Sequence, residues 1–352
     1  MTYESLTGGC LTGGFHAACQ GALIAAALTV GSAAMAQPAD NFFAGKTITL
    51  IVYSDAGSSY DTYARVLAKH MPNHIAGKPT IIVKNMVGAG GLTATRYLYN
   101  VAPRDGTTIG TLSRGIPFEP LFGNTVVEFD PLKFVWLGSM SKETTMYVSW
   151  YNTKIKKAQD ILEKEFLVAG TGAGADSEVI SRALNGVLGT KIKLISGYKG
   201  ASDAALRLEQ GEIEGIYWTW NGINTTHPDW ITNKKLNLLF QTRATPHPEL
   251  PDVPLVTVLA KTDEQRQALR LMFARDVLGR PFNAPPELPA DRAKTLREAF
   301  NASVKDPALL ADAQKGKMEI ELVTGEEVED IIRNAYATPK PIVDRVRDAM
   351  NR

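Results

Sequence analysis

Four short segments rich in glycine, serine and threonine carry the residues best suited to bind a small anion. They read SDAGSSYD, VGAGG, GTGAGADS and GYKGAS, and they begin at Ser54, Val87, Gly170 and Gly197. Glycine lets the backbone approach a ligand closely, and the free N–H groups at the start of a helix attract negative charge. Serine and threonine hydroxyls add further donors. These segments therefore predict a site for an anion such as a carboxylate.

Single side chains near these segments extend the candidate site. Asp61 is expected to brace the first loop or to cap the helix that follows, and Asp176 and Ser177 fit the start of a helix. Arg114 is the best cation for pairing a carboxylate. Trp218 and Trp220 alternate along an expected strand and face one side of it, either in the core or as an apolar cleft wall. The candidate ligand-binding residues are Ser54, Gly57, Ser58, Ser59, Tyr60, Asp61, Gly88, Ala89, Gly90, Gly91, Ser113, Arg114, Thr171, Ala173, Gly174, Ala175, Asp176, Ser177, Tyr198, Lys199, Gly200, Trp218 and Trp220.

Alternating strand and helix patterns position these segments. The expected strands are 47–53, 80–85, 108–113, 145–150, 166–170, 193–198, 213–218 and 236–242. The expected helices are 60–71, 91–101, 176–188, 202–210, 263–275, 289–304, 307–315, 325–335 and 339–350. This alternation predicts parallel sheets with helices on both faces, so the glycine-rich loops fall at the carboxyl ends of strands, where ligands bind. Asp306 and Thr324 stand where helix caps belong.

The strands and helices divide into two similar α/β units. We expect lobe 1 to comprise residues 37–142 and 256–352, and lobe 2 to comprise residues 143–255, with the last helices completing lobe 1. The chain then crosses between the lobes near 140–145 and again near 243–260. Two crossings make a hinge, and a carboxylate held by both lobes would couple binding to closure.

The first 36 residues differ in composition from the rest. They contain no Lys or Arg, they carry an Ala-rich apolar stretch from Gly21 to Ala34, and they end in Ala-Met-Ala. The stretch is too short to span a bilayer, so we predict a cleaved export signal and a periplasmic protein. The signal lacks the usual positive start, which leaves a different start codon or an N-terminal core helix as alternatives. Cys10 and Cys19 lie in this segment, so the mature chain would contain no cysteine.

Composition and motifs argue against several other functions. A net charge of +1 over 352 residues, without a long basic run, disfavours nucleic acid as a partner. His70 and His74 have metal-ligand spacing, but Pro72 interrupts the helix that would align them. The segment TIIVKNMVGAGGLTA resembles a dinucleotide fingerprint, yet the acid expected about 20 residues later is missing and only Asp105 stands ahead of the next strand. We expect no enzyme, no cofactor and no metal, with an NAD-dependent oxidoreductase as a remaining alternative.

Several longer segments occur in a fixed order between Thr47 and Met350. They read ITLIVYSDAGSSYDTYARVLAKHM, IIVKNMVGAGGLTATRYLYNVAPRDGTTIGTL, FDPLKFVWLGSM, GYKGASDAALRLEQGEIEG, APPELPADRAKTLREAF, VKDPALLADAQ and ATPKPIVDRVRDAM. In this order and spacing the chain resembles the extracytoplasmic receptors of tripartite tricarboxylate transporters, also called Bug receptors.

The resemblance implies a two-lobed periplasmic-binding-protein fold of the type II kind, with two doubly wound α/β domains, a two-crossing hinge and the ligand cleft between them. It implies a monomer that captures a small carboxylate and delivers it to integral-membrane permease subunits, without catalysis. It also implies that backbone amides and hydroxyls of 54–61, 88–91, 171–177 and 198–201 bind the carboxylate, partly through waters. A ligand-sensing protein that docks on a signalling receptor would have the same sequence.

The chain departs from the family pattern at its binding loops. Asp55 adds an acid to the first loop, and Met86 and Val87 replace the usual Arg-Pro before the glycine-rich loop. Asp176 and Glu178 place negative charge in the second-lobe loop. These departures predict an unusual ligand, aromatic or amide-bearing.

Overall fold

The computed structural model describes residues 42–54, 56–123, 127–170, 175–198 and 201–351. The chain divides into two compact units, Met1–Gln37 and Pro38–Arg352. All described residues belong to the second unit, so the expected export signal, with Cys10 and Cys19, lies outside them.

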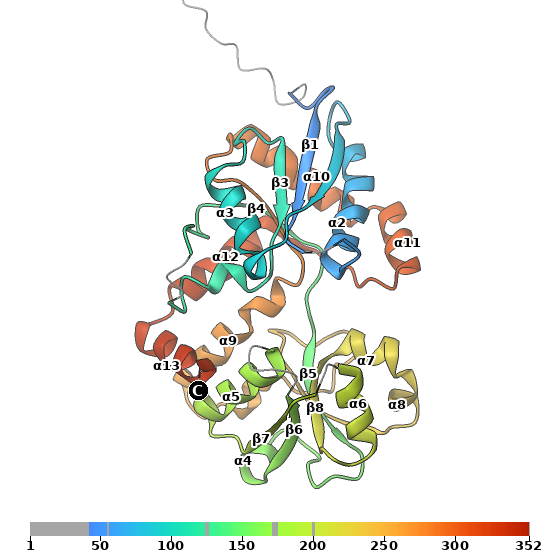
Figure 1. Ribbon diagram of the computed structural model, residues 1–352, viewed down its shortest axis with the longest axis vertical. Coiled ribbons are helices and arrows are strands. Elements are labelled where there is room, and N and C mark those ends of the chain that lie inside the picture. The colour runs from blue at the N-terminus through green and yellow to red at the C-terminus, as the bar shows by residue number, and fades with distance from the viewer. Residues whose placement is uncertain (1–41, 55, 124–126, 171–174, 199–200, 352) are drawn as a thin grey trace, which may run out of the picture. The chain divides into compact units, whose positions relative to one another are not determined.

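The first sheet has the strand order β11-β4-β10-β3-β1-β2. Figure 1 labels its strands β1, β3 and β4. Its strands are β1 Thr47–Val52, β2 Thr80–Asn85, β3 Thr108–Thr111, β4 Val135–Ser139, β10 Pro281–Ala284 and β11 Val323–Thr324. β1 is parallel to β2 and β3, but β10 is antiparallel to β3 and β4, and β11 is antiparallel to β4. The sheet is therefore mixed where a parallel sheet was expected, because β10 returns from the C-terminal part of the chain and inserts between β3 and β4.

The second sheet has the strand order β7-β6-β8-β5-β9. Its strands are β5 Thr145–Trp150, β6 Phe166–Gly170, β7 Ile192–Ser196, β8 Gly215–Thr219 and β9 Leu236–Gln241. β6 is parallel to β7 and β8, whereas β5 is antiparallel to β8 and β9. Every residue of β5 is buried, including the polar Thr145 and Ser149, because β5 lies between β8 and β9 in the sheet. This sheet is also mixed where a parallel sheet was expected. The pattern of side chains along a strand does not show in which direction the strand pairs, so the sequence did not reveal this pairing.

All nine expected helices are present, and the short helices α4, α7 and α8 were not expected. They are α2 Ser59–His70, α3 Leu92–Asn100, α4 Asp160–Glu163, α5 Asp176–Leu188, α6 Ala201–Glu209, α7 Trp220–Thr226, α8 Pro228–Thr232, α9 Asp263–Val277, α10 Ala290–Val304, α11 Pro307–Lys315, α12 Gly325–Tyr336 and α13 Lys340–Asn351. Short 3₁₀ turns are η1 Met71–His74, η2 Ala89–Gly91, η3 Ile116–Phe118 and η4 Val256–Leu259. Asp306 caps α11 and Thr324 forms a capping box with Glu327, which confirms both caps. Among the helices of the described ranges, none has the length and apolar character needed to cross a membrane.

Helices from different parts of the chain cover the two sheets. α2 packs on β1 and β2, and α10 and α12 pack on β4. α5 packs on β6, β7 and β8, α6 packs on β8, and both α9 and α13 pack on α5. The residue limits of the two lobes, at 142–143 and 255–256, stay a prediction.

Each sheet contains three adjacent parallel strands that carry the glycine-rich loops. In the first sheet these are β2, β1 and β3, and in the second they are β7, β6 and β8. Parallel neighbours end at the same edge, so the loops of each sheet lie together despite the antiparallel strands elsewhere.

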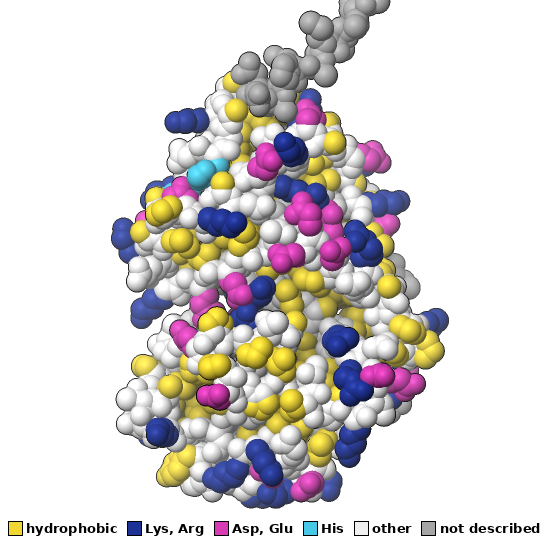
Figure 2. Space-filling view, turned by 180° about the vertical axis from the view of Figure 1, so that it is seen from behind, with side chains coloured by type: hydrophobic (Ala, Val, Ile, Leu, Met, Phe, Trp, Pro, Cys, Tyr) yellow, Lys and Arg dark blue, Asp and Glu magenta, His cyan; other side chains and the backbone are white. Residues whose placement is uncertain are grey.

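Side chains of both charges are interspersed over the face drawn in Figure 2, and no broad region of that face carries one sign. This mixture agrees with the net charge of +1.

Candidate ligand-binding site

The loop after β1 is closed by its own hydroxyl groups. The Oγ atoms of Ser54 and Ser58 lie 2.7 Å apart. Ser58 is also the N-cap of α2, and its Oγ accepts a hydrogen bond from the Asp61 N–H. Gly57 has a φ of 82°, a left-handed value that glycine adopts without strain. The loop therefore holds its shape through contacts within itself.

Asp61 supports this loop from inside the protein, with an exposed fraction of 2%. The Gly57 N–H and Arg65 Nε each donate to its Oδ2 at 2.8 Å, and Asn85 Nδ2 donates to its Oδ1 at 2.9 Å. Burial opposes ionisation, but the hydrogen bonds from Arg65, Gly57 and Asn85 outweigh it and lower the pKa of Asp61 to about 2. Asp61 is an ionised brace whose acceptor capacity is used within its own loop and its neighbours.

Tyr60 connects the first loop to the segment after β3. Its hydroxyl accepts a hydrogen bond of 3.2 Å from the Arg114 backbone N–H. Its ring meets the Tyr53 ring edge to face, with centroids 4.7 Å apart, and the Arg280 guanidinium lies 4.6 Å from its centroid. Arg280 Nη2 also donates to Ser59 Oγ at 2.7 Å. An aromatic pair with a cation against it therefore stands beside the first loop.

The glycine-rich turn before α3 depends on left-handed backbone. Gly88, Ala89, Gly90 and Gly91 have φ values of 148°, 46°, 64° and 106°. A Cβ at Gly91 would lie 3.0 Å from the Tyr53 ring, whereas a Cβ at Gly90 would meet no atom within 4 Å. The turn thus needs glycine at 91 for packing and at 90 for backbone conformation alone. Ala89 and Gly90 are exposed at the start of the helix.

Arg114 joins the segment after β3 to acids from three other parts of the chain. Its Nη2 donates to Asp176 Oδ2 at 2.9 Å, and its Nη1 lies 3.2 Å from Asp276 Oδ1 and 3.6 Å from Glu143 Oε2. Burial disfavours the guanidinium charge, but Asp276 and Glu143 outweigh burial and raise the pKa of Arg114. Arg114, expected to pair a ligand carboxylate, is already paired with carboxylates of the protein.

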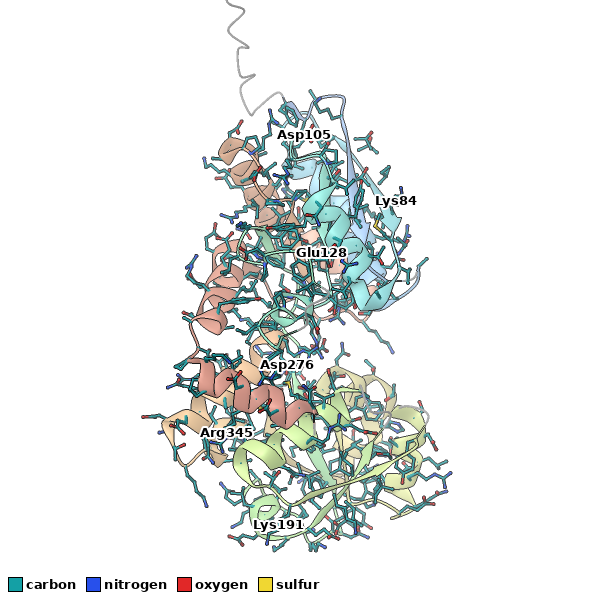
Figure 3. The ribbon with its side chains drawn as sticks, turned by 60° about the vertical axis from the view of Figure 1, so that its left-hand side comes forward. Lys84, Asp105, Glu128, Lys191, Asp276 and Arg345 are labelled. Carbon is teal, nitrogen blue, oxygen red and sulfur yellow. The ribbon has the colours of Figure 1, made fainter. Side chains whose placement is uncertain are left out.

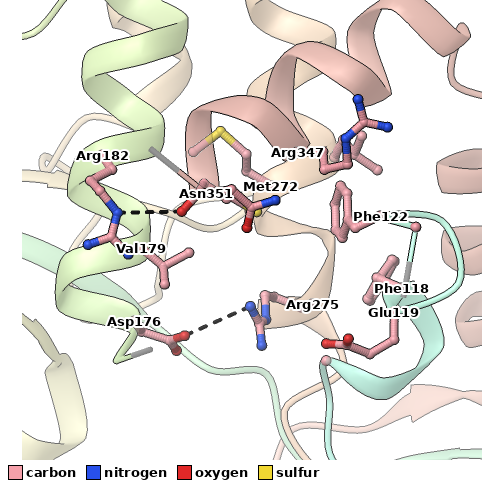
Figure 4. A pocket seen from close by; sticks show the side chains of 14 residues that line it. Phe118, Glu119, Phe122, Asp176, Val179, Arg182, Met272, Arg275, Arg347 and Asn351 are labelled. Carbon is pink, nitrogen blue, oxygen red and sulfur yellow. Dashed lines mark hydrogen bonds and ion pairs between the residues drawn. The ribbon is translucent and has the colours of Figure 1, made fainter. Parts of the chain in front are cut away.

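Two further arginines contact the same acids. Arg275 Nη1 lies 3.8 Å from Asp176 Oδ1 (Figure 4), and Arg280 Nη1 donates to Glu143 Oε2 at 2.9 Å. Three arginines and three acids are thus connected in one network. We call this network the arginine cluster, and its members are Arg114, Arg275, Arg280, Glu143, Asp176 and Asp276.

Asp276, labelled in Figure 3, is the most buried acid of the arginine cluster, with an exposed fraction of 2%. The hydroxyls of Thr145 and Thr242 lie 3.0 and 2.9 Å from its Oδ2. Thr145 Oγ1 is also 2.6 Å from the Tyr217 hydroxyl. Burial raises the pKa of Asp276, and the Arg114 charge counteracts it. Burial and the Asp276 charge together raise the pKa of Tyr217, which therefore stays a neutral phenol.

A cavity of about 190 Å³ adjoins Arg114 near the carboxyl ends of β6 and β8, and we call it the central cavity. Its wall combines apolar groups with hydroxyls and one cation. The lining residues are Arg114, Thr145, Ala169, Ala175, Asp176, Ser177, Ala204, Ile216, Tyr217, Trp218 and Thr219. Five candidate residues from the sequence therefore meet at this cavity: Arg114, Ala175, Asp176, Ser177 and Trp218.

The two tryptophans separate. Trp218 lines the central cavity, but β8 ends at Thr219 and Trp220 is the first residue of α7. Trp220 is 4% exposed and its Nε1 donates to Glu249 Oε2 at 2.7 Å. The expectation that both rings share one strand face is wrong, because the chain turns into a helix between them. Trp220 belongs to the core of the second sheet.

The other candidate residues either do not line the central cavity or lie outside the described part of the chain. The N-cap of α5 is Ala175, so Asp176 and Ser177 lie in the first helical turn and do not cap it. Tyr198 donates its N–H to the Gly170 carbonyl at 3.3 Å, and the Ser113 carbonyl accepts from the Ile116 N–H at 3.0 Å. The candidates Thr171, Ala173, Gly174, Lys199 and Gly200, together with Asp55, lie outside the described residues.

Four members of the arginine cluster were not among the candidate residues from the sequence. Glu143, Arg275, Asp276 and Arg280 follow no glycine-rich loop, and single charges in helices usually indicate a solvated face. The segment ARDVLGRP, residues 274–281, is the one available signal, since it places two arginines and an acid at the end of a helix just before a strand.

Comparison with known proteins identifies the family of the chain. Residues 63–347 match the model of the tripartite tricarboxylate transporter family receptor, TctC. The UPF0065 protein in the TAR-I ttuE-ttuC′ intergenic region of Agrobacterium vitis is 27% identical over 287 residues, which cover 77% of this chain and 75% of that protein.

Solved structures show the same fold. A TctC solute-binding protein from Polaromonas has a TM-score of 0.69 at 19% identity, with 85% of this chain and 98% of that chain covered. Rpa4515 of Rhodopseudomonas palustris with adipate has a TM-score of 0.57 at 15% identity, covering 86% and 97%. MatC of the same organism with bound malate has a TM-score of 0.54 at 17% identity, covering 85% and 99%. These likenesses confirm the expected two-lobed periplasmic-binding-protein fold.

Proposed function

We propose a transport function for this chain, which belongs to the tripartite tricarboxylate transporter receptor family. In this proposal the chain acts in the periplasm as a monomer after its export signal is removed. It captures a small carboxylate, either a di- or tricarboxylate or an aromatic acid, between its two lobes. It then delivers the ligand to integral-membrane permease subunits, without catalysis and without a cofactor.

The observation that carries the proposal is the central cavity beside Arg114. Arg114 follows a strand of the first sheet, whereas most of the cavity wall comes from the second sheet and its helices. A carboxylate that contacts Arg114 from this cavity therefore touches both parts of the chain, which is how binding favours lobe closure in a hinged receptor. MatC with malate and Rpa4515 with adipate support a small carboxylate as the kind of ligand.

Arg114 retains donor capacity for such a ligand. Its Nη1 is buried and makes no hydrogen bond within the described ranges, although Asp276 lies at ion-pair distance. Asp276 and Glu143 pair with this nitrogen by charge without a hydrogen bond, so an acceptor that hydrogen-bonds to it contributes favourable free energy. The hydroxyl of Thr219, also in the cavity wall, would add a further donor.

A thermal-shift screen of the purified protein tests the proposal. The compounds are mono-, di- and tricarboxylates, aromatic acids, amino acids and NAD. A ligand at 100 times its Kd stabilises the native state by about 2.7 kcal/mol, enough to raise Tm by several degrees.

We expect one class of acid to raise Tm with saturation. A rise with NAD alone would favour the oxidoreductase alternative, and a screen without any shift by an acid would contradict the carboxylate receptor. Size-exclusion chromatography with light scattering tests the monomer.

A further inference from the structure

The central cavity and the arginine cluster together restrict which acid can bind, and this restriction rests on the carboxylate-receptor function proposed above. We infer that the cavity selects a small monocarboxylate with a flat apolar body over dicarboxylates, and that Asp176 is the residue that sets this preference.

The size and lining of the central cavity suit a flat apolar body. Its volume is about 190 Å³, and an apolar cavity of about 150 Å³ holds one benzene molecule. Trp218 and Ile216 supply the larger apolar surfaces, and Ala169, Ala175 and Ala204 supply small ones. A planar ring can stack on or meet the Trp218 indole edge to face. The cavity therefore matches an aromatic acid of one ring.

The polar groups of the wall are few and largely occupied. The Tyr217 hydroxyl and Thr145 Oγ1 lie 2.6 Å apart, and Thr145 Oγ1 lies 3.0 Å from Asp276 Oδ2. Thr219 Oγ1 accepts a hydrogen bond from the Gly222 N–H at 3.0 Å. Of the lining residues that the structure describes, Arg114 alone is a cation. A ligand with two carboxylates would find a charged partner for one of them.

The net charge of the arginine cluster also favours a monocarboxylate over a dicarboxylate. Arg114, Arg275 and Arg280 carry three positive charges, and Glu143, Asp176 and Asp276 carry three negative charges when all are ionised. With all six groups ionised, the cluster is neutral. A bound monoanion therefore leaves the site with one net negative charge, whereas a bound dianion leaves it with two. Negative charge in excess is unfavourable where water is excluded.

Asp176 is the acid of the cluster that a bound ligand would meet. It lines the central cavity, with 38% of its side chain exposed, and its carboxylate contacts Arg114 at 2.9 Å and Arg275 at 3.8 Å. Asp276 and Glu143 contact Arg114 as well, but neither lines the central cavity. A ligand carboxylate at Arg114 therefore competes with Asp176 and is repelled by it, and each added negative charge on the ligand increases that repulsion.

A second cavity offers the strongest alternative. It has a volume of about 780 Å³, shares Asp176 with the central cavity, and is lined by Arg182, Arg275 and Arg347 (Figure 4). A long dicarboxylate could place its second charge there. Arg182 already donates to Glu178 at 3.2 Å, and Arg347 donates to Asp344 at 2.8 Å. These acids already pair with two of the three arginines, so a ligand carboxylate in the second cavity would have to compete with them.

Isothermal titration calorimetry with two matched pairs of probes tests the inference. The pairs are benzoate against benzene-1,4-dicarboxylate, and hexanoate against adipate. In the wild-type protein we expect the monoanion of each pair to bind at least tenfold more tightly, with benzoate the tightest. In Asp176→Asn we expect the dianions to gain affinity, so that the ratio within each pair narrows by at least fivefold. The control is Asp229→Asn, because Asp229 is an exposed acid on α8 that pairs with Lys235. We expect this variant to leave the affinity ratio within each pair unchanged.

The outcomes separate the two proposals. Tighter binding of the dianions by the wild-type protein, or ratios that Asp176→Asn does not move, would overturn the inference while leaving the carboxylate receptor intact. A protein that binds none of the probes, and no acid in the wider screen, would contradict both. The ratio within a pair reports charge preference and not stability, so a general structural effect of the Asp176 substitution does not imitate the expected result.

Discussion

Two aspartates that follow glycine-rich loops have opposite surroundings. Asp61 is 2% exposed and accepts hydrogen bonds from Gly57, Arg65 and Asn85, all in the first-sheet region. Asp176 is 38% exposed, and its partners Arg114 and Arg275 belong to other elements than its own helix. The same residue type in similar sequence contexts thus serves as an internal brace in one loop and as a contact between segments in the other.

If the proposed site is correct, the first loop needs no rearrangement for a ligand, whereas a ligand must replace contacts of Asp176. The first loop is already shaped by Asp61, so its backbone needs no rearrangement to present donors. The Arg114 contact with Asp176 is partly solvated and can exchange for a ligand carboxylate at modest cost.

The largest effect should come from Asp61→Asn. The amide cannot accept the hydrogen bonds of Arg65 and Gly57 as a carboxylate does, so we expect the free energy of unfolding to fall by about 2–3 kcal/mol. Urea unfolding measures this change. Asp330→Asn, which removes the exposed partner of Arg333, is the control and should cost less than about 0.5 kcal/mol. Equal losses in both variants would show that Asp61 is not a brace.

Lowering the pH should remove the stabilisation that the ionised Asp61 carboxylate contributes. The pKa of Asp61 falls from 3.8 to about 2 on folding, so its stabilisation is present above about pH 4 and is lost as the pH falls towards 2. The wild-type protein should exceed Asp61→Asn in stability by on the order of 2 kcal/mol at pH 5, and the difference should vanish near pH 2. Urea titrations at several pH values measure it. A difference independent of pH would refute the role of the Asp61 charge.

A smaller effect is expected for Gly90→Ala. The left-handed φ of 64° costs alanine about 1 kcal/mol, while no atom lies within 4 Å of the new Cβ. We also expect benzoate affinity to fall at least tenfold, because the methyl group stands in the glycine-rich turn. Gly211→Ala is the control, because Gly211 has a φ of 76°, equally open space around a new Cβ and a place away from the site. We expect it to lose as much stability as Gly90→Ala and to keep its affinity for benzoate. Retained affinity in Gly90→Ala would exclude this turn from the site.

The smallest change in stability should come from Asp176→Asn. Its ion pairs are partly exposed, and such pairs contribute about 0–1 kcal/mol. We therefore expect a loss below about 1 kcal/mol by urea unfolding, well below that of Asp61→Asn. A loss as large as that of Asp61→Asn would abolish the distinction between the two aspartates.

The local structure was largely predictable from the sequence. The expected strands 80–85, 145–150 and 166–170 and helices 176–188 and 307–315 agree with the structure residue for residue. These segments combine clear periodicity with glycine, proline or capping residues at their ends, so local physics determines them.

Pairings between distant segments were not predictable in the same way. β10 begins with a proline, has four residues and lies between the short turn 278–280 and the proline-rich segment 285–289, so nothing local indicates that it enters the first sheet. The arginine cluster depends on that entry, because Arg275, Asp276 and Arg280 lie at or beside the turn from α9 into β10. The candidate residues in the loops that follow parallel strands were therefore predictable from the sequence. The cluster residues beside the antiparallel strand β10 were not.

The packing of α13 on α5 has a consequence for the order in which the chain can fold. Gly186 and Ala349 touch so closely that a Cβ at 186 would lie 2.7 Å from the Ala349 Cβ. α13 thus covers a helix that lies far earlier in the chain, and α5 stays uncovered until α13 has been made. Contacts so distant in sequence form late and slow folding. Slow completion of the fold keeps the chain extended for longer, which suits the export that we propose for it.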